Sequence, residues 1–230
     1  MRYLIIGLGI YGSNLAIDLT NMGHEVIGAD SNPNLVDAIK DTISTAYIID
    51  STEEVALSVL PLRNIDLAIV AIGENFGASI KTVAILKKLG VKHIFARAAD
   101  ALHRSILEGF NIDRILNPEE RAARDLVHEM GLGLNVEAMK LDSTHYVMTF
   151  RAPAVFVGTL YSSLNLPKEY GLRLIAAGRS QDETNMIGME HESYSLLDLE
   201  GNPSEKVESG DTFTCFGTSD AYRELVKANS

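Results

Sequence analysis

Short apolar runs alternate with helical patterns along the first half of the chain. Leu67–Ile72 is apolar throughout, as expected for a strand buried on both faces of a sheet. The helical stretch that follows ends in Lys87 and Lys88, with Gly90 just beyond, and these residues suit a helix C-terminus. We therefore predict a parallel sheet whose strands alternate with helices. The predicted strands are Tyr3–Ile6, Glu25–Ala29, Ala46–Ile49, Leu67–Ile72, His93–Ala96 and Arg114–Leu116, and the predicted helices are Gly12–Met22, Asn34–Asp41, Val55–Leu60, Phe76–Leu89, Ala99–Glu108 and Glu119–Met130.

The α/β rhythm stops after Gly131-Leu132-Gly133. Beyond this point the chain shows partly alternating apolar stretches and a closing helical stretch, which predict a small α+β domain. We therefore place the domain boundary between residues 133 and 134, so that the first domain (1–133) includes the helix Glu119–Met130 and the second covers 134–230. In the second domain we predict strands at Val136–Leu141, Tyr146–Arg151, Leu172–Ala176, Tyr194–Asp198 and Thr212–Phe216, helices at Thr159–Leu164 and Asp220–Lys227, and surface loops at Asp182–Glu192 and Gly201–Glu208.

Three glycines mark a nucleotide-binding turn near the N-terminus. Gly7, Gly9 and Gly12 follow the first predicted strand and open the first predicted helix, and Asp30 follows the next strand. This context predicts a Rossmann-like, doubly wound α/β domain. The first glycine permits a tight turn, the second lets the backbone approach a phosphate, and the third lets the helix pack against the sheet. Asp30 can accept hydrogen bonds from both ribose hydroxyls, which favours a nucleotide without a 2′-phosphate.

Further candidate ligands follow the other predicted strands. Asp50 ends the third strand, where it can accept from an adenine amino group, cap the next helix, or do both. Ser51 and Glu54 have the spacing of a capping box. The run 71–76 ends the fourth strand, and Arg97 ends the fifth as a candidate phosphate or ribose ligand. The candidate nucleotide-binding residues are Gly7, Gly9, Ile10, Tyr11, Gly12, Asp30, Ser31, Asp50, Ser51, Ala71, Ile72, Gly73, Glu74, Asn75 and Arg97.

Composition and charge narrow the function classes. Of the 230 residues, 46% are hydrophobic and 22% charged, as expected for an ordered globular protein. The net charge of −11 comes with no basic stripe or tail, so we predict no nucleic-acid binding. The first apolar run is too short to span a bilayer, and no targeting leader precedes it, so we expect a cytoplasmic protein. The single cysteine, Cys215, excludes an internal disulfide and is predicted to be a buried core residue.

The sequence offers little support for catalysis. A dehydrogenase needs a general acid or base near the nicotinamide. The histidines are scattered, and the sequence has no Gly-x-Ser-x-Gly, no Walker lysine motif and no cysteine cluster. We therefore interpret the nucleotide as a signal; a small NAD-dependent oxidoreductase and an interaction domain with an empty turn remain alternatives. The histidines, each interpreted as structural, are His24, His93, His103, His128, His145 and His191.

Longer motifs extend over both halves of the chain. They include Gly-Leu-Gly-Ile-Tyr-Gly at 7–12, Ala-Ile-Gly-Glu-Asn-Phe-Gly-Ala-Ser at 71–79, Arg-Ile-Leu-Asn-Pro-Glu-Glu at 114–120, Phe-Val-Gly-Thr-Leu at 156–160 and Val-Glu-Ser-Gly-Asp-Thr at 207–212. In these motifs and their order the whole chain resembles the cytoplasmic regulatory subunits of Trk/Ktr potassium transporters, the RCK or KTN proteins. The second domain then corresponds to the small C-terminal domain of that family.

The resemblance implies a regulatory protein rather than an enzyme. Family members assemble as dimers, and usually as an octameric ring, beneath a membrane potassium-translocating subunit at the inner face of the cell membrane. The exchange of ATP for ADP, or of NADH for NAD, changes the ring and so the transporter. For this chain the resemblance implies an adenine nucleotide, NAD(H) or ATP/ADP, with phosphates on the glycine turn, the ribose on Asp30, the adenine near Asp50 and a basic contact from Arg97. The helix Glu119–Met130 would cross over to the partner subunit.

The resemblance raises three further points. Glu119 matches a glutamate that in some members helps to hold a divalent cation, although an acid at a helix start also has a purely structural interpretation. Ile10 stands where some ATP-responsive members carry an arginine that reaches a terminal phosphate, so NAD(H), ADP and AMP remain open as ligands. Some members bind cyclic di-AMP between paired C-terminal domains, for which Arg173 and Arg179 are the candidate cations or else only solvated side chains.

Overall fold

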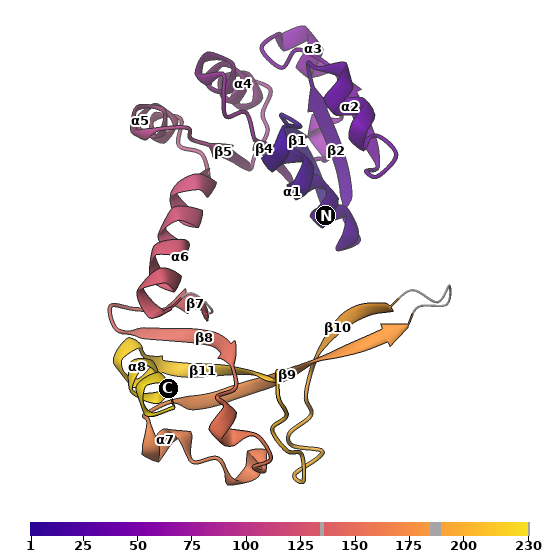
Figure 1. Ribbon diagram of the computed structural model, residues 1–230. Coiled ribbons are helices and arrows are strands. Elements are labelled where there is room, and N and C mark those ends of the chain that lie inside the picture. The colour runs from indigo at the N-terminus through magenta and orange to yellow at the C-terminus, as the bar shows by residue number, and fades with distance from the viewer. Residues whose placement is uncertain (134–135, 185–189, 230) are drawn as a thin grey trace. The chain divides into compact units, whose positions relative to one another are not determined.

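The chain forms two compact units in the computed structural model (Figure 1), Met1–Pro118 and Glu119–Ser230. The structure describes residues 1–133, 136–184 and 190–229, with side chains except at 181–184 and 190–193. Helix α6, Pro118–Leu132, starts at the boundary between the units and is counted with the second. Its assignment to the nucleotide-binding domain, with a boundary after residue 133, remains our proposal.

The first unit is built on a six-stranded parallel sheet in the order β3-β2-β1-β4-β5-β6. This is the strand order of a doubly wound Rossmann-type sheet, in which the chain direction across the sheet reverses between β1 and β4. The predicted fold class is therefore confirmed. The strands are β1 (Arg2–Ile6), β2 (Glu25–Asp30), β3 (Thr45–Ile48), β4 (Leu67–Val70), β5 (Ile94–Arg97) and β6 (Arg114–Leu116), and the helices are α1 (Ile10–Asn21), α2 (Pro33–Ile39), α3 (Glu54–Ser58), α4 (Phe76–Lys88) and α5 (Ala101–Gly109), with a 3-10 turn at Leu62–Asn64.

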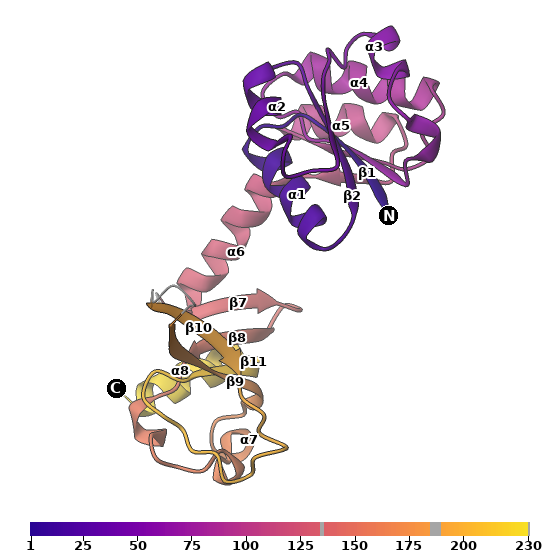
Figure 2. The same ribbon diagram turned by 90° about the vertical axis from the view of Figure 1, so that its right-hand side faces the viewer.

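Helices cover both faces of this sheet, and each face has its own core (Figure 2). On one face α1 and α2 pack over Ile5, while on the other α3, α4 and α5 pack over Leu4 and Ile6. All three strand residues are at most 1% exposed. Successive strand side chains point to opposite faces, so a strand covered on both sides is apolar throughout, which is why these runs were recognisable in the sequence.

Two local predictions in the first unit are wrong. The spacing of Ser51 and Glu54 predicted a capping box, but α3 begins at Glu54 directly after Glu53, which makes no side-chain cap, and the Ser51 hydroxyl is buried elsewhere. Asp50, the other predicted cap, does not cap this helix either. Its Oδ1 instead accepts from the Thr52 amide at 2.8 Å, in a turn that precedes the helix. Local spacing could not reveal that α3 starts two residues later than the capping motif requires.

The second unit contains a five-stranded antiparallel sheet in the order β10-β9-β11-β8-β7. One face of the sheet packs against α8, whose Tyr222 and Leu225 join Phe150, Phe213 and Cys215 in a single core. The thiol of Cys215 is fully buried, as predicted. The elements are β7 (Val136–Lys140), β8 (His145–Arg151), β9 (Arg173–Thr184), β10 (Glu190–Leu196), β11 (Thr212–Thr218), α7 (Leu166–Glu169) and α8 (Ser219–Ala228), with 3-10 turns at Ala154–Phe156 and Tyr161–Ser163.

Two predictions in the second unit also need correction. The helix predicted at Thr159–Leu164 is wrong, because Leu160 is extended and pairs with Lys206, and only one 3-10 turn follows. The surface loop predicted at Asp182–Glu192 is wrong at both ends, since β9 continues to Thr184 and pairs there with the start of β10. The middle of that loop, 185–189, lies outside the described residues. The loop Gly201–Glu208 has no helix or strand longer than the bridge at Lys206.

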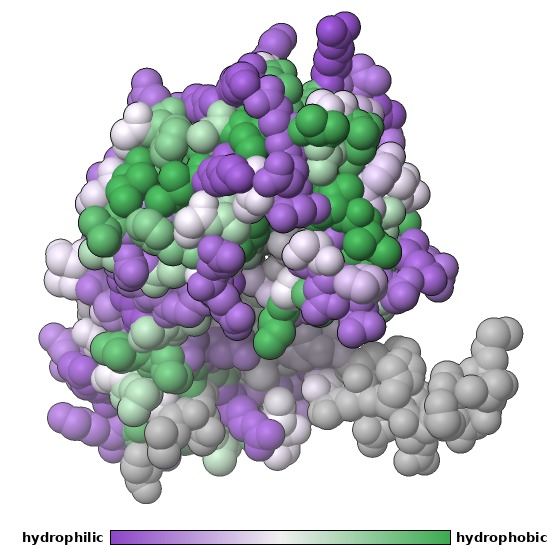
Figure 3. Space-filling model, turned by 90° about the horizontal axis from the view of Figure 1, so that it is seen from above, coloured by the Kyte–Doolittle hydropathy of each residue, from purple (hydrophilic) through white to green (hydrophobic). Residues whose placement is uncertain are grey.

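The molecular surface mixes apolar and charged residues. Figure 3 shows one face on which green apolar side chains lie in small groups between purple hydrophilic ones. Exposed apolar residues of the first unit include Ile10, Val55 and Val59. Within the described residues, no helix combines the length and the apolar character needed to cross a membrane.

Candidate functional site

The carboxyl ends of the parallel strands align at one edge of the first sheet. Ile6, the last residue of β1, lies opposite Ala29 in β2 and Val70 in β4. The residues that follow these strands therefore emerge side by side, at the point where the strand order reverses. In doubly wound sheets this crevice is where ligands bind. We refer to the residues that border it as the rim: the turn 7–12, Asp30, Asp50, the turn 71–75 and Arg97.

The glycine turn has the geometry that a phosphate-binding loop requires. Gly7 has φ of +93°, a left-handed conformation that glycine adopts without strain. A Cβ atom on Gly12 would overlap the carbonyl oxygen of Gly7, so only glycine fits there. Gly9 precedes α1 and faces open space, because a Cβ atom built on it meets no atom within 4 Å. The first two backbone positions of α1 thus present their amides to an accessible surface, which suits an anion.

Asp30 is held in place by the turn it faces. Its Oδ2 accepts from the amide of Leu8 at 2.7 Å, and its Oδ1 accepts from the amide of Asn32 at 2.8 Å. Each carboxylate oxygen can accept a further hydrogen bond, so ribose hydroxyls still find acceptors. The neighbouring Ser31 is exposed beside it. Sequence reasoning missed both donors, because backbone amides carry no signal in residue identity.

Arg97 lies across the crevice from the glycine turn. Its guanidinium carbon is 5.8 Å from the centre of the Tyr11 ring, at cation–π distance. A Cβ atom on Gly73 would overlap the Arg97 guanidinium, so the absence of a side chain in that turn makes room for the cation. Ile10, by contrast, is 87% exposed at the start of α1. The rim therefore combines helix amides with one guanidinium group and an exposed apolar side chain.

The remaining rim residues border the crevice from β3 and β4. Asp50 is exposed, and the hydrogen bond from the Thr52 amide lowers the pKa of its carboxyl, so it is ionised at neutral pH. Ala71 and Ile72 pack against Gly7 through their backbone. Asn75 caps α4 by accepting from the Ala78 amide at 3.0 Å. Glu74, in the same turn as Asn75, is exposed.

His103 lies at the start of α5 but is not presented to the rim. It is fully buried, burial lowers the pKa of its imidazole, and its Nδ1 accepts from the amide of Ala99. Its ring packs edge-on against Phe76. A neutral, enclosed imidazole has a structural role, in agreement with the interpretation from the sequence, and is poorly placed to act as a general acid or base at the rim. The side chain of His191 lies outside the described residues.

The structure leaves the metal prediction as a proposal. Glu119 is exposed in the first turn of α6. Among the described residues, no group of three or more His, Cys, Asp or Glu side chains gathers as a set of ligands. A cation held by Glu119 would therefore need ligands from a nucleotide or a second subunit, as the resemblance implies.

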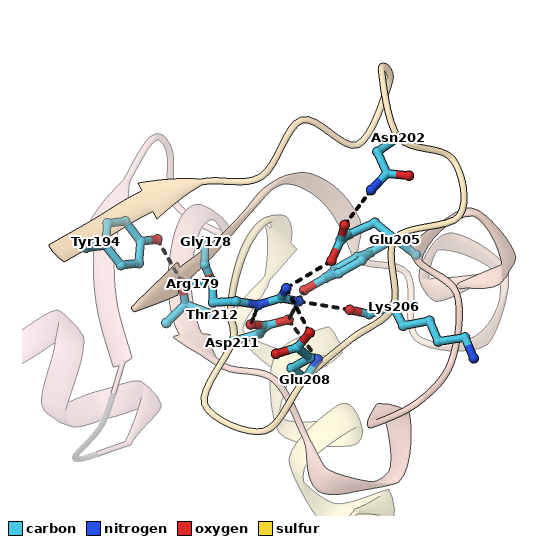
Figure 4. Close-up of polar contacts among 10 residues, drawn as sticks. Gly178, Arg179, Tyr194, Asn202, Glu205, Lys206, Glu208, Asp211 and Thr212 are labelled. Carbon is cyan, nitrogen blue, oxygen red and sulfur yellow. Dashed lines mark hydrogen bonds and ion pairs between the residues drawn. The ribbon is translucent and has the colours of Figure 1, made fainter. Parts of the chain in front are cut away.

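Arg179 is an internal ion-pairing residue rather than a free cation (Figure 4). Its Nε and Nη2 donate to the two carboxylate oxygens of Asp211 at 2.7 and 2.9 Å, and its Nη1 donates to Glu205 at 2.9 Å and lies 3.0 Å from Glu208. Its Nη2 also donates to the carbonyl of Lys206. The interpretation of Arg179 as a solvated side chain is therefore wrong, while its role as a cyclic di-AMP ligand stays a prediction. Arg173, the other candidate, is exposed.

Asp211 is the centre of this cluster. It is fully buried and accepts from the Tyr161 hydroxyl at 2.8 Å and from the Glu208 amide at 2.8 Å, in addition to Arg179. Burial alone raises the pKa of Asp211, but these hydrogen bonds outweigh it and hold the pKa below its usual range. Burial and the contact with Asp211 raise the pKa of Tyr161. The cluster joins β9 to the polar loop before β11.

An open cavity of about 740 Å³ lies within the second unit. It includes neither Arg173 nor Arg179; the cation in its lining is Arg151, at the end of β8, which sequence reasoning missed. Three threonines line it: Thr149 from β8, and Thr212 and Thr214 from alternate positions on β11. The lining residues are Glu129, Val136, Glu137, Thr149, Phe150, Arg151, Tyr194, Leu196, Thr212 and Thr214.

The fold and the rim together define a Rossmann-type nucleotide-binding protein with a small α+β domain. Residues 3–118 match the model of the TrkA-N domain, and the chain belongs to this family. It is similar to the Ktr system potassium uptake protein C of Bacillus subtilis, with 33% identity over 79% of this chain and 82% of that protein. It is also similar to the Ktr system potassium uptake protein A of the same organism, with 30% identity over 76% of this chain and 79% of that protein. Among solved structures, the GsuK RCK domain has the same fold, with a TM-score of 0.61 and 13% identity over 100% of this chain and 47% of that one. The resemblance to RCK regulatory subunits is thus confirmed.

Proposed function

We propose that the protein is a regulatory subunit of a Ktr-type potassium uptake transporter, and that an adenine nucleotide at the rim is its signal. The observation that carries the proposal is the 33% identity with a Ktr potassium uptake protein over four-fifths of the chain. The protein then works at the inner face of the cell membrane, bound to the potassium-translocating subunit. The nucleotide alters the subunit's conformation and thereby the transporter's activity.

The chemistry of the rim supports an adenine nucleotide. Phosphates would meet the amides at the start of α1 beside Gly9, the ribose would meet Asp30, and the adenine amino group would meet Asp50. A GsuK channel, similar to this chain in fold alone, has been solved bound to NAD, with a TM-score of 0.59 and 13% identity. We propose NAD(H) or ADP ahead of ATP, because Ile10 offers no cation to a terminal phosphate.

The same rim gives no support to a dehydrogenase. His103 is enclosed, and its Nδ1 is already engaged by the Ala99 amide. Arg97 and Asp50 are charged groups suited to binding, and neither has the properties of a general base near neutral pH. We therefore propose that the nucleotide is bound and released unchanged.

Titration calorimetry of the purified protein with ATP, ADP, NAD and NADH, with light scattering on the same samples, tests this function. We expect saturable binding of at least one adenine nucleotide, no consumption of the ligand, and particles of dimer size or larger. Steady oxidation of NADH with a small carbonyl substrate would instead support the dehydrogenase. A monomer that binds none of the four nucleotides would contradict the proposal.

We propose that α6 is the crossover helix between two subunits. Leu126, Val127 and Met130 are 55, 64 and 61% exposed at helical spacing, and exposed apolar groups of this kind mark interaction surfaces. Pairing through α6 would give a dimer, and further contacts between dimers would give an octameric ring.

Replacing Leu126 with aspartate is expected to convert the assembly to monomers, because a charge would have to be buried against the partner helix. Analytical ultracentrifugation would measure this change. Arg121→Gln on the opposite side of α6 is the matched control; Arg121 is exposed and pairs with Asp125 on the same helix at 3.7 Å. An L126D protein with the wild-type sedimentation coefficient would rule out this face of α6 as the dimer contact.

Two ligands of the assembled protein remain as proposals. We propose that Glu119 contributes to a divalent cation near the nucleotide phosphates of a paired subunit, in which case Mg²⁺ should strengthen nucleotide binding. A cyclic di-AMP site between paired C-terminal domains would have to use Arg173, since Arg179 already has carboxylate partners. Both sites require the dimer.

A further inference from the structure

The segment that carries Asp50 is fastened to α4 by a buried pair of hydroxyl groups. Ser51 Oγ lies 2.8 Å from Thr82 Oγ1, and Thr82 Oγ1 donates to the carbonyl of Ser51 at 3.3 Å. If Thr82 donates to that carbonyl, the Ser51 hydroxyl donates to Thr82 Oγ1, so both hydroxyls are satisfied. Ser51 is 8% exposed and Thr82 is fully buried. Leaving a buried hydroxyl without a hydrogen-bond partner costs free energy, so this contact strongly constrains the position of Ser51 relative to α4.

Two ion pairs connect the same segments but contribute little to this constraint. Lys81 lies 3.4 Å from Glu53, and Lys88 lies 2.6 Å from Glu54. At least one side chain of each pair is more than half exposed, and ion pairs in water have small net energies. The hydroxyl pair is therefore the buried polar contact that fixes Ser51 against α4, beside the apolar packing of Leu57 in the same core.

The same segment holds Asp50 in one orientation. Asp50 Oδ1 accepts from the Thr52 amide at 2.8 Å, and the Asp50 carbonyl accepts from the Glu53 amide at 3.1 Å. These two bonds close a tight turn around Ser51, whose side chain points into the protein toward Thr82. A displacement of Ser51 would consequently move the Asp50 carboxylate on the rim.

We propose that Thr82 is a positioning residue for recognition of the adenine base: it anchors Ser51 and thereby sets the Asp50 carboxylate opposite the adenine amino group. The inference rests on the proposed function, because it requires a nucleotide with its base beside Asp50. Adenine presents an amino donor at this edge, whereas guanine presents a carbonyl acceptor. A carboxylate only accepts, so a correctly placed Asp50 selects adenine over guanine.

Thr82→Val tests this role, because it keeps the side-chain volume and removes the hydroxyl. We expect the ratio of ADP to GDP affinity, measured by calorimetry, to fall by about tenfold, the usual worth of one hydrogen bond to a charged group. Thr82→Ser retains the hydroxyl and should restore the ratio. Thr20→Val is the matched control, because the Thr20 hydroxyl donates to the Ala16 carbonyl within α1, and its ratio should equal that of the wild type.

The outcomes separate this inference from the proposed function. If the wild-type protein binds ADP and T82V weakens the binding of ADP and of GDP equally, the positioning role is overturned and the regulatory function stands. Wild-type protein that binds neither nucleotide, nor NAD(H) or ATP, would overturn both. If T82V does not fold, Ser51→Ala removes the contact between the two hydroxyl groups from the other side and keeps only the longer bond from Thr82 to the Ser51 carbonyl. An unchanged ratio in that variant would refute the role of the hydroxyl pair in placing Asp50.

Discussion

Gly12→Ala is expected to abolish nucleotide binding and to destabilise the first unit by about 3 kcal/mol or more, a size that single substitutions reach when they force the backbone to move. The added methyl group would overlap the Gly7 carbonyl oxygen and press on Ala71. The turn between β1 and α1 must then open, which displaces the amides at the start of α1. Thermal unfolding followed by circular dichroism, together with calorimetry, would measure both effects.

Gly9→Ala is the matched substitution in the same turn. Its methyl group would extend into open space, and its φ of −64° is available to alanine, so the fold should be as stable as the wild type. Nucleotide affinity should nevertheless fall, because the methyl group stands where a phosphate approaches the backbone. Wild-type affinity in G9A would mean that the phosphate does not contact this position, and wild-type melting of G12A would contradict the packing of the turn.

Asp211→Ala is expected to destabilise the second unit by about 3–5 kcal/mol, the usual consequence of removing one partner from a buried ion pair. The substitution leaves the Arg179 guanidinium, which is 14% exposed, without its two-oxygen partner, and removes the acceptor of the Tyr161 hydroxyl. A fall of about 10–20 °C in melting temperature follows for a unit of this size. Asp220→Ala, which removes an 86% exposed carboxylate from a surface pair with Arg223, should change the melting temperature little.

The pH dependence of the same variant provides a second readout. The pKa of Asp211 is lower in the folded protein than in the unfolded chain, where the pKa of aspartate is about 3.9. The ionised carboxylate therefore stabilises the fold fully above that value, and its contribution is lost as pH falls through the lower folded pKa. Wild-type and D211A proteins should differ most near neutral pH and converge in strong acid. A constant difference down to pH 2 would show that Asp211 acts through packing alone.

The parallel sheet could be predicted because strands buried on both faces consist of continuous runs of apolar residues, as in Leu67–Val70. The edge strand β10 has no such apolar run, because a polar sequence can pair through its backbone alone. The polar character of its first residues therefore suggested a loop. The helix predicted at Thr159–Leu164 failed for a related reason. The apolar spacing there is compatible with a helix, but the bridge between Leu160 and Lys206 is a long-range contact that local spacing does not encode.

The candidate site likewise has features that local sequence predicts and contacts that it does not. The glycine turn and Asp30 were recognisable because their spacing to the strand ends is a local property. The contacts that orient these groups join segments far apart in the chain, such as Ser51 with Thr82 and Arg179 with Asp211. Their residue types are common on protein surfaces, so local spacing suggests a helix cap for Ser51 and either a ligand site or a solvated side chain for Arg179. Only the folded arrangement distinguishes a buried polar pair from a solvated one.

The burial of Cys215 makes the protein well suited to site-specific labelling. Burial raises the pKa of its thiol to about 12 and leaves no part of the residue exposed, so the reactive thiolate is absent at neutral pH. The natural sequence therefore already provides a background without a reactive thiol. A spin label or fluorophore on one introduced cysteine, for example Met22→Cys at a 70% exposed position, would report from that position alone. In an oligomer, distances between such labels with and without nucleotide would give the movement of one subunit relative to the next.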